Sequence, residues 1–191
     1  MARQNRTRRR IGVTGSPATG KRTVAELLSR MLGVRAHSIN RLAAEAALVT
    51  EGGEVELRAG RVGRMLLSLT SGEDSYIIYG PFLWDLFPRS RLDLVVVLRC
   101  NPAVLHRRYV ERGYGARKAA DNVTAEAIGY VYAECLSKYG RKVRQMDATG
   151  RSPEQVAEAV VAMAEGRADD EESVDWLSAA AEDPELLRLL L

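Results

Sequence analysis

The sequence predicts an α/β fold in which a parallel β-sheet is flanked by helices on both faces. Short strand-like apolar stretches alternate with segments of helical periodicity along most of the chain, which is typical of an open parallel sheet. Residues 92–98 are almost continuously apolar, as expected of a central strand that is buried on both faces. With 191 residues, of which 46% are hydrophobic, the chain can bury a sizeable core in one domain.

Five segments have the composition of strands. The first leads into the glycine at position 15, and the third, Tyr-Ile-Ile-Tyr, consists of β-branched and aromatic residues and ends at Gly80. The fourth is the apolar run described above, and the last ends at Asp147. The expected strands cover residues 11–15, 34–39, 76–79, 92–98 and 143–147.

Capping residues mark where several helices begin. Asn40 is placed to cap the second helix, and Asn101 precedes a proline at the first position of another. Ser152, followed by Pro153, starts the closing helix in the same way. After the helix that begins at Lys21, the expected helices cover residues 42–48, 55–69, 102–110 and 123–139, and one begins at residue 153.

The turn between the first strand and its helix reads G-S-P-A-T-G-K-R-T, residues 15–23, and has the spacing of a phosphate-binding P-loop. Gly15 and Gly20 allow the backbone to turn back so that successive amide groups point into one hollow. The positive end of the following helix dipole adds to this field, and Lys21 supplies a charge for the outer phosphates. The alternative is a glycine turn beside an ordinary surface lysine, but the strand–loop–helix context favours a P-loop NTPase that binds ATP.

Two positions depart from the standard loop. A Ser or Thr that holds Mg²⁺ usually follows the lysine directly, whereas this chain has Arg22 and then Thr23. Nucleoside monophosphate kinases of the adenylate kinase type often carry the hydroxyl one place later, which makes Thr23 the candidate Mg²⁺ ligand. Ala18 replaces a usual glycine, and its methyl group costs on the order of 1 kcal/mol if the backbone there needs a positive φ.

The chain resembles the archaeal and eukaryotic adenylate kinases that also act as assembly factors for the small ribosomal subunit. The loop matches the family pattern, and R-G-Y-G-A-R-K-A-A-D-N at residues 112–122 is similar to the family's short lid. Residues 92–105 look like the family strand and its exit, and residues 147–156 look like its final strand and the loop beside the adenine ring. The resemblance runs from about Ile11 to Ala164.

The resemblance implies a broad-specificity nucleoside monophosphate kinase that converts ATP and AMP to two ADP with Mg²⁺, and that has weak ATPase activity. It also implies a role in late maturation of the small ribosomal subunit and 16S rRNA, with a small-subunit ribosomal protein and pre-rRNA as partners. Lys21 and Arg112 are then the expected catalytic residues. The expected nucleotide-binding residues are Gly15, Ala18, Gly20, Lys21, Arg22, Thr23 and Arg112.

The cations of the lid suit phosphoryl transfer, because negative charge spreads over the moving group and needs cations that close over it. Arg108 and Arg112 lie four residues apart and share a helical face. Further candidate phosphate contacts are Arg99, Arg107, Arg117 and Lys118. The alternative is that these cations form an ordinary solvated face.

The third strand lacks the acid and the nearby histidine that the family carries at its end. Residues 77–88 read I-I-Y-G-P-F-L-W-D-L-F-P, so neither Tyr79 nor Gly80 is acidic. Asp85 is the nearest acid, and a turn or helix cap is its expected role. This departure favours a rival interpretation, a weakened P-loop assembly factor in which ATP acts as a conformational switch. A different small-molecule kinase is a third alternative, which the lid motif weakens.

Composition divides the chain into a basic arm (1–10), a kinase-like domain (11–165) and an acidic linker with a helical tail (166–191). The arm either contacts rRNA phosphates or is a solubilising tail, and the net charge of +3 does not decide between them. The tail, with Trp176 and several leucines, is suited to docking onto a basic partner or back onto the domain. No apolar stretch approaches a membrane span or a signal peptide, so we expect a cytoplasmic protein.

Overall fold

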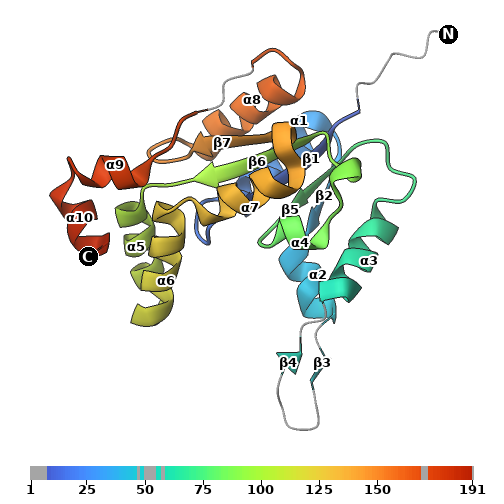
Figure 1. Cartoon of the computed structure of the whole chain (residues 1–191). Coiled ribbons are helices and arrows are strands. Elements are labelled where there is room, and N and C mark those ends of the chain that lie inside the picture. Colours follow the sequence, from blue (N-terminus) through green and yellow to red (C-terminus); the bar gives the residue numbers. More distant parts are fainter. Residues whose placement is uncertain (1–7, 47, 50–54, 57–58, 169–171, 191) are drawn as a thin grey trace.

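The computed structural model of the chain describes residues 8–46, 48–49, 55–56, 59–168 and 172–190. Its centre is a five-stranded sheet in the order β2-β5-β1-β6-β7 (Figure 1). The strands are β1 (Arg10–Gly15), β2 (Arg35–Ser38), β5 (Tyr76–Tyr79), β6 (Leu94–Arg99) and β7 (Val143–Asp147). Every neighbouring pair in this sheet is parallel. The predicted parallel sheet and its strands are therefore confirmed, with small shifts at some ends.

Helices cover both faces of this sheet, as predicted. On one face α1 (Lys21–Leu32) packs against α8 (Pro153–Ala164). The other face carries α2 (Ile39–Ala46), α3 (Ala59–Leu69), α4 (Leu83–Leu86) and α7 (Tyr130–Tyr139). Beyond the carboxyl end of β6 lie α5 (Pro102–Glu111) and α6 (Ala116–Ala127). Short 3-10 turns cover Arg89–Arg91 and Gly140–Lys142, and β3 (Leu48–Val49) pairs antiparallel with β4 (Val55–Glu56) in a separate hairpin.

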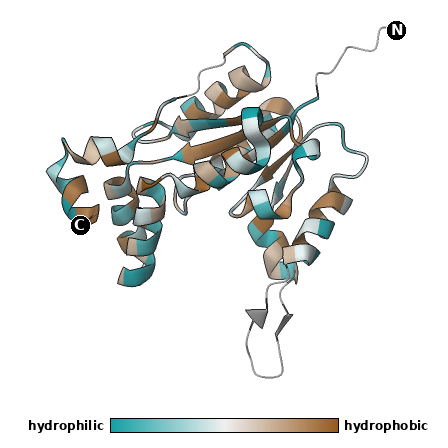
Figure 2. Ribbon diagram, viewed as in Figure 1, coloured by the Kyte–Doolittle hydropathy of each residue, from teal (hydrophilic) through white to brown (hydrophobic). Residues whose placement is uncertain are grey.

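The central strand β6 is buried on both faces. Val95 and Val97 point into the core beneath α3, α4 and α7, whereas Val96 and Leu98 point into the core beneath α1 and α8. Figure 2 shows most of β6 in the brown of apolar residues, with hydrophilic residues on the outer helices. The continuous apolar run in the sequence reflects this two-sided burial.

Three helix predictions need correction. The helix predicted over 55–69 begins only at Ala59, since Val55–Glu56 form β4 and pair with β3. The second helix begins at Ile39 rather than residue 42, so Asn40 lies inside it and is not its cap. The Ser38 side chain takes that role, since its hydroxyl accepts a hydrogen bond from the Arg41 amide at 3.3 Å. The predicted helix over 123–139 is two helices, α6 and α7, because Gly129 adopts a left-handed conformation with a φ of 67°.

The other capping predictions are confirmed. Asn101 accepts a hydrogen bond from the Ala103 amide at the start of α5. Ser152 and Gln155 form a capping box at the start of α8, with Pro153 at the first helical position. Within α3, Val62 and Leu66 are buried as expected, whereas Leu69 at its end is 45% exposed.

The C-terminal segment docks back onto the domain. It contains α9 (Trp176–Ala180) and α10 (Pro184–Leu190), and α10 packs against α5 and α6 (Figure 1). Trp176, Ala180 and Leu186 are buried. Of the two placements expected for this tail, the structure therefore shows the intramolecular one.

The basic arm meets the fold at its last residues. Most of the arm, residues 1–7, lies outside the described residues. Arg9 pairs with Glu165 at 2.9 Å, and Arg10, the first residue of β1, pairs with Asp93 at 2.7 Å. Within the described ranges, no helix has both the length and the apolar character needed to cross a bilayer.

The buried hydroxyl of Tyr139 predicts a measurable loss of stability on its removal. It lies 2.8 Å from the Leu83 carbonyl oxygen and 2.9 Å from that of Phe87, and so ties α7 to α4. Tyr139→Phe should lower the free energy of unfolding by about 1–2 kcal/mol, because buried carbonyls lose a donor. Urea denaturation measures this loss. Tyr130→Phe is the control, since Tyr130 is 44% exposed and should change stability by less than about 0.5 kcal/mol.

Candidate nucleotide-binding site

The loop after β1 lies at the edge where the parallel strands end, the edge at which α/β sheets bind ligands. Gly15 has a φ of 141°, and a Cβ there would collide with the Leu98 carbonyl oxygen of β6. Gly20 caps α1 without a side chain, and the first turn of α1 has no acidic residue. The amides and the positive dipole end of α1 are therefore left available to an anion.

Ala18 has a left-handed backbone with a φ of 64°. This conformation is strained for a residue with a methyl side chain, as the sequence led us to expect. Two side chains of α5 hold this part of the loop. Arg108 donates from Nη1 to the Ala18 carbonyl oxygen at 2.9 Å, and the Tyr109 hydroxyl donates to the Pro17 carbonyl oxygen at 2.9 Å. Because surrounding contacts fix it, the strained conformation is part of the site rather than a loose turn.

Lys21 folds back over the loop. Its ammonium Nζ donates to the Ser16 carbonyl oxygen at 2.7 Å, and the Thr19 hydroxyl donates to the same oxygen at 2.9 Å. Burial lowers the pKa of Lys21 to about 8; the charge of Glu126 opposes this shift and that of Arg112 adds to it. The ammonium is thus held beside the hollow and is poorly solvated, which favours exchange of the carbonyl for a phosphate.

Arg22 and Thr23 are both exposed. The Arg22 guanidinium pairs with Glu26, one helical turn further along α1, at 2.8 Å. This pairing leaves its backbone amide, in the first turn of α1, as the part of Arg22 suited to a phosphate. Thr23 follows in the same turn and remains the candidate Mg²⁺ ligand.

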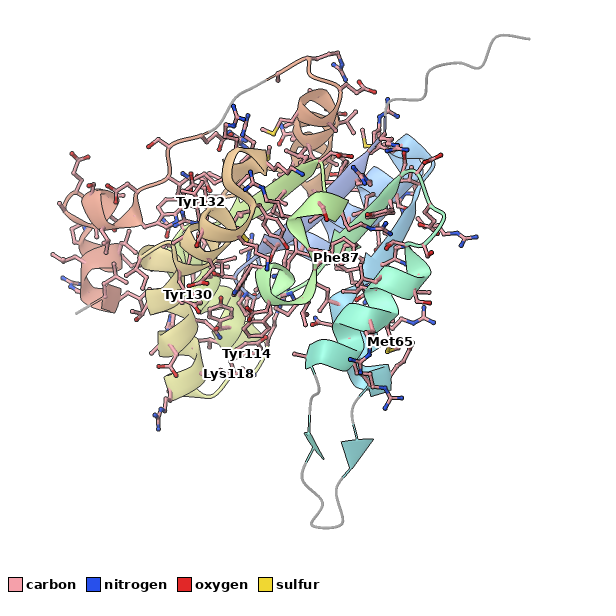
Figure 3. All side chains as sticks on the ribbon, turned by 45° about the vertical axis from the view of Figure 1, so that its right-hand side comes forward. Met65, Phe87, Tyr114, Lys118, Tyr130 and Tyr132 are labelled. Atoms are coloured by element: carbon pink, nitrogen blue, oxygen red, sulfur yellow. The ribbon has the colours of Figure 1, made fainter. Side chains whose placement is uncertain are left out.

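The lid is anchored to the loop through stacked rings. Tyr114 stacks on Tyr109 with ring centroids 5.1 Å apart, and Lys118 Nζ lies 4.8 Å above the Tyr114 ring (Figure 3). Arg112 is the residue that ends α5, and it is exposed. Its charge adds to the lowering of the Lys21 pKa, after the larger effect of burial. A joint role of the loop lysine and the lid arginine stays a prediction.

Two of the further candidate cations are engaged elsewhere. Arg99 is buried, and its guanidinium donates to both Glu126 and Gln145, so the prediction that it contacts a phosphate is wrong. Arg99 lies at a strand end where a ligand contact was expected. Its side chain instead points into the protein interior, toward Glu126 and Gln145. Arg107 pairs with Glu185 of α10 at 2.9 Å on the surface.

Glu126 is a site residue that the sequence analysis did not identify. Only 1% of it is exposed, and its Oε2 accepts a hydrogen bond from the Ser16 hydroxyl of the loop at 2.5 Å. A signal was present, because Glu126 shares the buried face of α6 with Ala119, Val123 and Ala127. A carboxylate on an otherwise apolar helix face needs a buried partner. That partner, Arg99, is too distant in sequence for local periodicity to indicate.

One of the two positions where the resemblance would lead us to expect an acid, Gly80, is closed to a side chain. Gly80 has a φ of 146°, and a Cβ there would lie 2.6 Å from Ile39 Cβ. Its carbonyl oxygen accepts from the Thr14 hydroxyl at 2.8 Å, and its amide donates to the Val13 carbonyl. Asp85 is exposed in the first turn of α4, a helix-end position like the one expected for it.

The described residues fit Mg²⁺ only as an ion that arrives with the triphosphate. In the part of the chain that the structure describes, no group of three or more His, Cys, Asp or Glu could hold a metal ion. Mg²⁺ retains several waters and is often held by substrate phosphates with one or two protein oxygens. The Thr23 hydroxyl suits that arrangement, since it lies in the first turn of α1 beside the hollow.

Solved structures share this fold. A shikimate kinase from Aquifex aeolicus vf5 aligns with a TM-score of 0.52 and 21% identity, over 83% of this chain and 97% of that one. A gluconokinase from Sinorhizobium meliloti 1021 aligns with a TM-score of 0.54 and 13% identity, over 86% of this chain and 95% of that one. TT1252 from Thermus thermophilus aligns with a TM-score of 0.59 and 19% identity, over 81% of this chain and 96% of that one. The fold is therefore that of the P-loop kinases, as the sequence predicts.

Sequence relatives identify the family. Residues 11–129 match the protein family described as AAA domain. A Natronomonas pharaonis protein named "Putative adenylate kinase" is 38% identical over 160 residues, which cover 82% of this chain and 90% of the relative. A protein of the same name from Thermococcus onnurineus is 32% identical over 154 residues, which cover 80% of this chain and 82% of the relative. The chain belongs to this adenylate kinase-like family, which confirms that part of the resemblance.

The lowered pKa of Lys21 predicts a pH-dependent affinity for ATP. Phosphate binding needs the ammonium form, which the free protein loses as the pH rises through about 8. The affinity should therefore be constant below that pH and fall by up to about tenfold per pH unit above it, with proton uptake on binding. Titration calorimetry in two buffers of different ionisation enthalpy measures both effects.

Lys21→Arg is the matched control for this pH dependence, because a guanidinium stays charged over the whole range. Its affinity for ATP should not change between about pH 7 and 9.5. A wild-type affinity that is equally flat would contradict the lowered pKa.

Proposed function

We propose that this protein is a nucleoside monophosphate kinase that transfers the terminal phosphoryl group of ATP to AMP and related monophosphates. The observation that carries the proposal is the loop before α1, where Lys21 folds back over the Ser16 carbonyl oxygen at a helix start that has no acidic residue. Arg112, at the end of α5, is the second cation of the proposal, and two cations from separate segments suit a group whose charge grows as it moves between two nucleotides. The name of the archaeal relatives supports the same reaction.

In this mechanism the loop binds the donor and the lid completes the site. The amides of residues 15–22 and the end of α1 hold the outer phosphates, and Lys21 exchanges the Ser16 carbonyl for a phosphate oxygen. Arg112 then meets the charge on the transferred group as the lid excludes water. Thr23 would help to hold the Mg²⁺ that arrives with the triphosphate, and the ion would neutralise part of the phosphate charge. The acceptor contributes an ionised oxygen, so transfer needs no protein base.

A second function, an ATP-dependent switch in assembly of the small ribosomal subunit, is favoured by Gly80. The packing of Gly80 against Ile39 leaves no room for an acidic side chain at this position, and Tyr79 is not acidic either. In this alternative ATP is bound and slowly hydrolysed, and the partners are a small-subunit ribosomal protein and pre-rRNA. Arg8, Arg9 and Arg10 already pair with acids of the domain, so contact with rRNA would depend mainly on the arginines of residues 1–7.

A coupled assay for ADP formation separates the two functions. With AMP present, ADP should form from ATP much faster than ATP is hydrolysed without AMP, because only hydrolysis needs an oriented water. We expect a ratio of transfer to hydrolysis of at least about 100. A protein that binds ATP but forms no ADP beyond the hydrolysis rate would contradict the kinase and support the switch.

The position of Arg112 predicts a kinetic effect. Arg112→Ala should lower kcat about 100-fold and change the KM for ATP much less, because the guanidinium acts mainly on charge that develops during transfer. Steady-state rates with ATP and AMP test this. Arg107→Ala is the matched control, since Arg107 lies on the same helix but pairs with Glu185 of the tail. Equal kcat values for wild type and Arg112→Ala would make Arg112 a surface residue.

A further inference from the structure

We propose that Glu126 is a positioning residue for ATP, and that Trp176 of the C-terminal segment completes its hydrogen bonding, so that docking of this segment and ATP binding favour one another. The inference rests on the proposed binding of ATP at the P-loop. It goes beyond it by giving the segment after residue 165 a role in nucleotide affinity.

Glu126 is a fully satisfied buried carboxylate. Its Oε1 accepts hydrogen bonds from Arg99 Nε at 2.7 Å, from the Cys100 amide at 3.1 Å and from the indole N–H of Trp176 at 3.2 Å. Its Oε2 accepts from the Ser16 hydroxyl at 2.5 Å. One side chain therefore joins the end of β6, the P-loop and the C-terminal segment.

The link continues from Ser16 to the phosphate hollow. The Ser16 carbonyl oxygen accepts from both Lys21 and Thr19, so the orientation of this one residue sets the first turn of the loop. The Ser16 hydroxyl donates to Glu126 Oε2, which holds its side chain in place. Glu126 thus acts on phosphate binding through the geometry of the loop.

The link also continues from Trp176 along the segment. Trp176 is 8% exposed, and Leu186 is completely buried. Leu189 and Leu190 pack against the cluster that contains Tyr109 and Ala119, on the two helices that flank the lid. Docking of the segment therefore supports α5 and α6 on either side of Arg112.

Hydrogen bonds tie the segment down at its start as well. Glu172 Oε2 accepts from the Asp147 amide at 2.7 Å, and Glu172 Oε1 pairs with Arg151 at 2.6 Å. The segment is thus anchored at both ends, and Trp176 contacts Glu126 between these anchors. Since coupling between two binding events is reciprocal, ATP must stabilise the docked segment as much as the docked segment stabilises bound ATP.

The chain allows a spectroscopic test, because it contains two tryptophans, Trp84 and Trp176. In the Trp84→Phe variant, all tryptophan fluorescence comes from Trp176. Addition of ATP should change this emission, with the midpoint at the dissociation constant that calorimetry gives for the same variant. Ser16→Ala, which cuts the link between Glu126 and the loop, should abolish the emission change at saturating ATP. An emission that does not respond while ATP binds would overturn the proposal.

A second test measures ATP affinity by calorimetry, with no need for turnover. Trp176→Phe keeps an aromatic ring but removes the N–H donor, and should weaken ATP binding about 3- to 10-fold. Glu126→Gln should weaken it further, since it replaces the carboxylate that accepts hydrogen bonds from Ser16 and Arg99. Leu177→Ala is the matched control, because Leu177 lies on the same helix and is 55% exposed. Thermal unfolding of each variant identifies any that does not fold, and Trp176→Phe is the decisive variant if Glu126→Gln fails.

The outcomes distinguish this inference from the proposed function. If wild type and Trp176→Phe bind ATP equally well, the coupling is wrong and the ATP site stands. If the wild type binds no ATP, the proposed function is wrong and the coupling falls with it. A weaker affinity in Trp176→Phe with an unchanged kcat would support a positioning role, since a merely structural loss would lower both.

Discussion

The carboxyl edge of this sheet depends on one buried ion pair, Arg99–Glu126, whose side chains are 3% and 1% exposed. Two charges at such depth are tolerated only because each is fully hydrogen-bonded, and removal of either would leave the other unpaired at about 3–5 kcal/mol. Arg99 also donates to the Glu126 carbonyl at the end of α6 and to Gln145 of β7. The pair therefore fixes the end of α6, two neighbouring strands and, through Ser16, the P-loop. The strained backbone at Ala18 is tolerated because this ion pair holds the neighbouring strand ends and the P-loop in place.

The same edge limits the chemistry that the site can perform. Gly80 packs so closely on Ile39 that any side chain at this position would have to displace α2. The carboxylate that contacts the loop directly, Glu126, is already engaged with Ser16 and Arg99. Cations such as Lys21 and Arg112 suit the stabilisation of a moving phosphoryl group, but they do not orient or deprotonate a water. The proposed function, transfer with slow hydrolysis, is consistent with this arrangement.

The sequence predicts the features that local physics determines. Strand composition gave the five strands, and the spacing of Gly15, Gly20 and Lys21 gave the loop, because each depends on neighbouring residues alone. The break at Gly129 was missed because apolar periodicity continues through it from α6 into α7. Arg99 was misassigned for a different reason: its partner Glu126 lies 27 residues away, and no local pattern reports such a contact. The closure of the site at Gly80 likewise depends on Ile39, from another part of the chain.

The division of the chain at residue 165 follows composition but not contacts. Acidic residues after Gly166 mark a change in character, yet Glu172 bonds to the end of β7 and Trp176 bonds to the carboxylate beneath the P-loop. The free energy of docking the segment is consequently shared with the loop and the lid helices, and cannot be assigned to the tail alone. If the proposed coupling holds, substitutions of the buried residues Trp176 and Leu186 will alter the nucleotide site, even though neither belongs to the P-loop or the lid. The kinase fold and its C-terminal segment would then act as one energetic unit around Glu126.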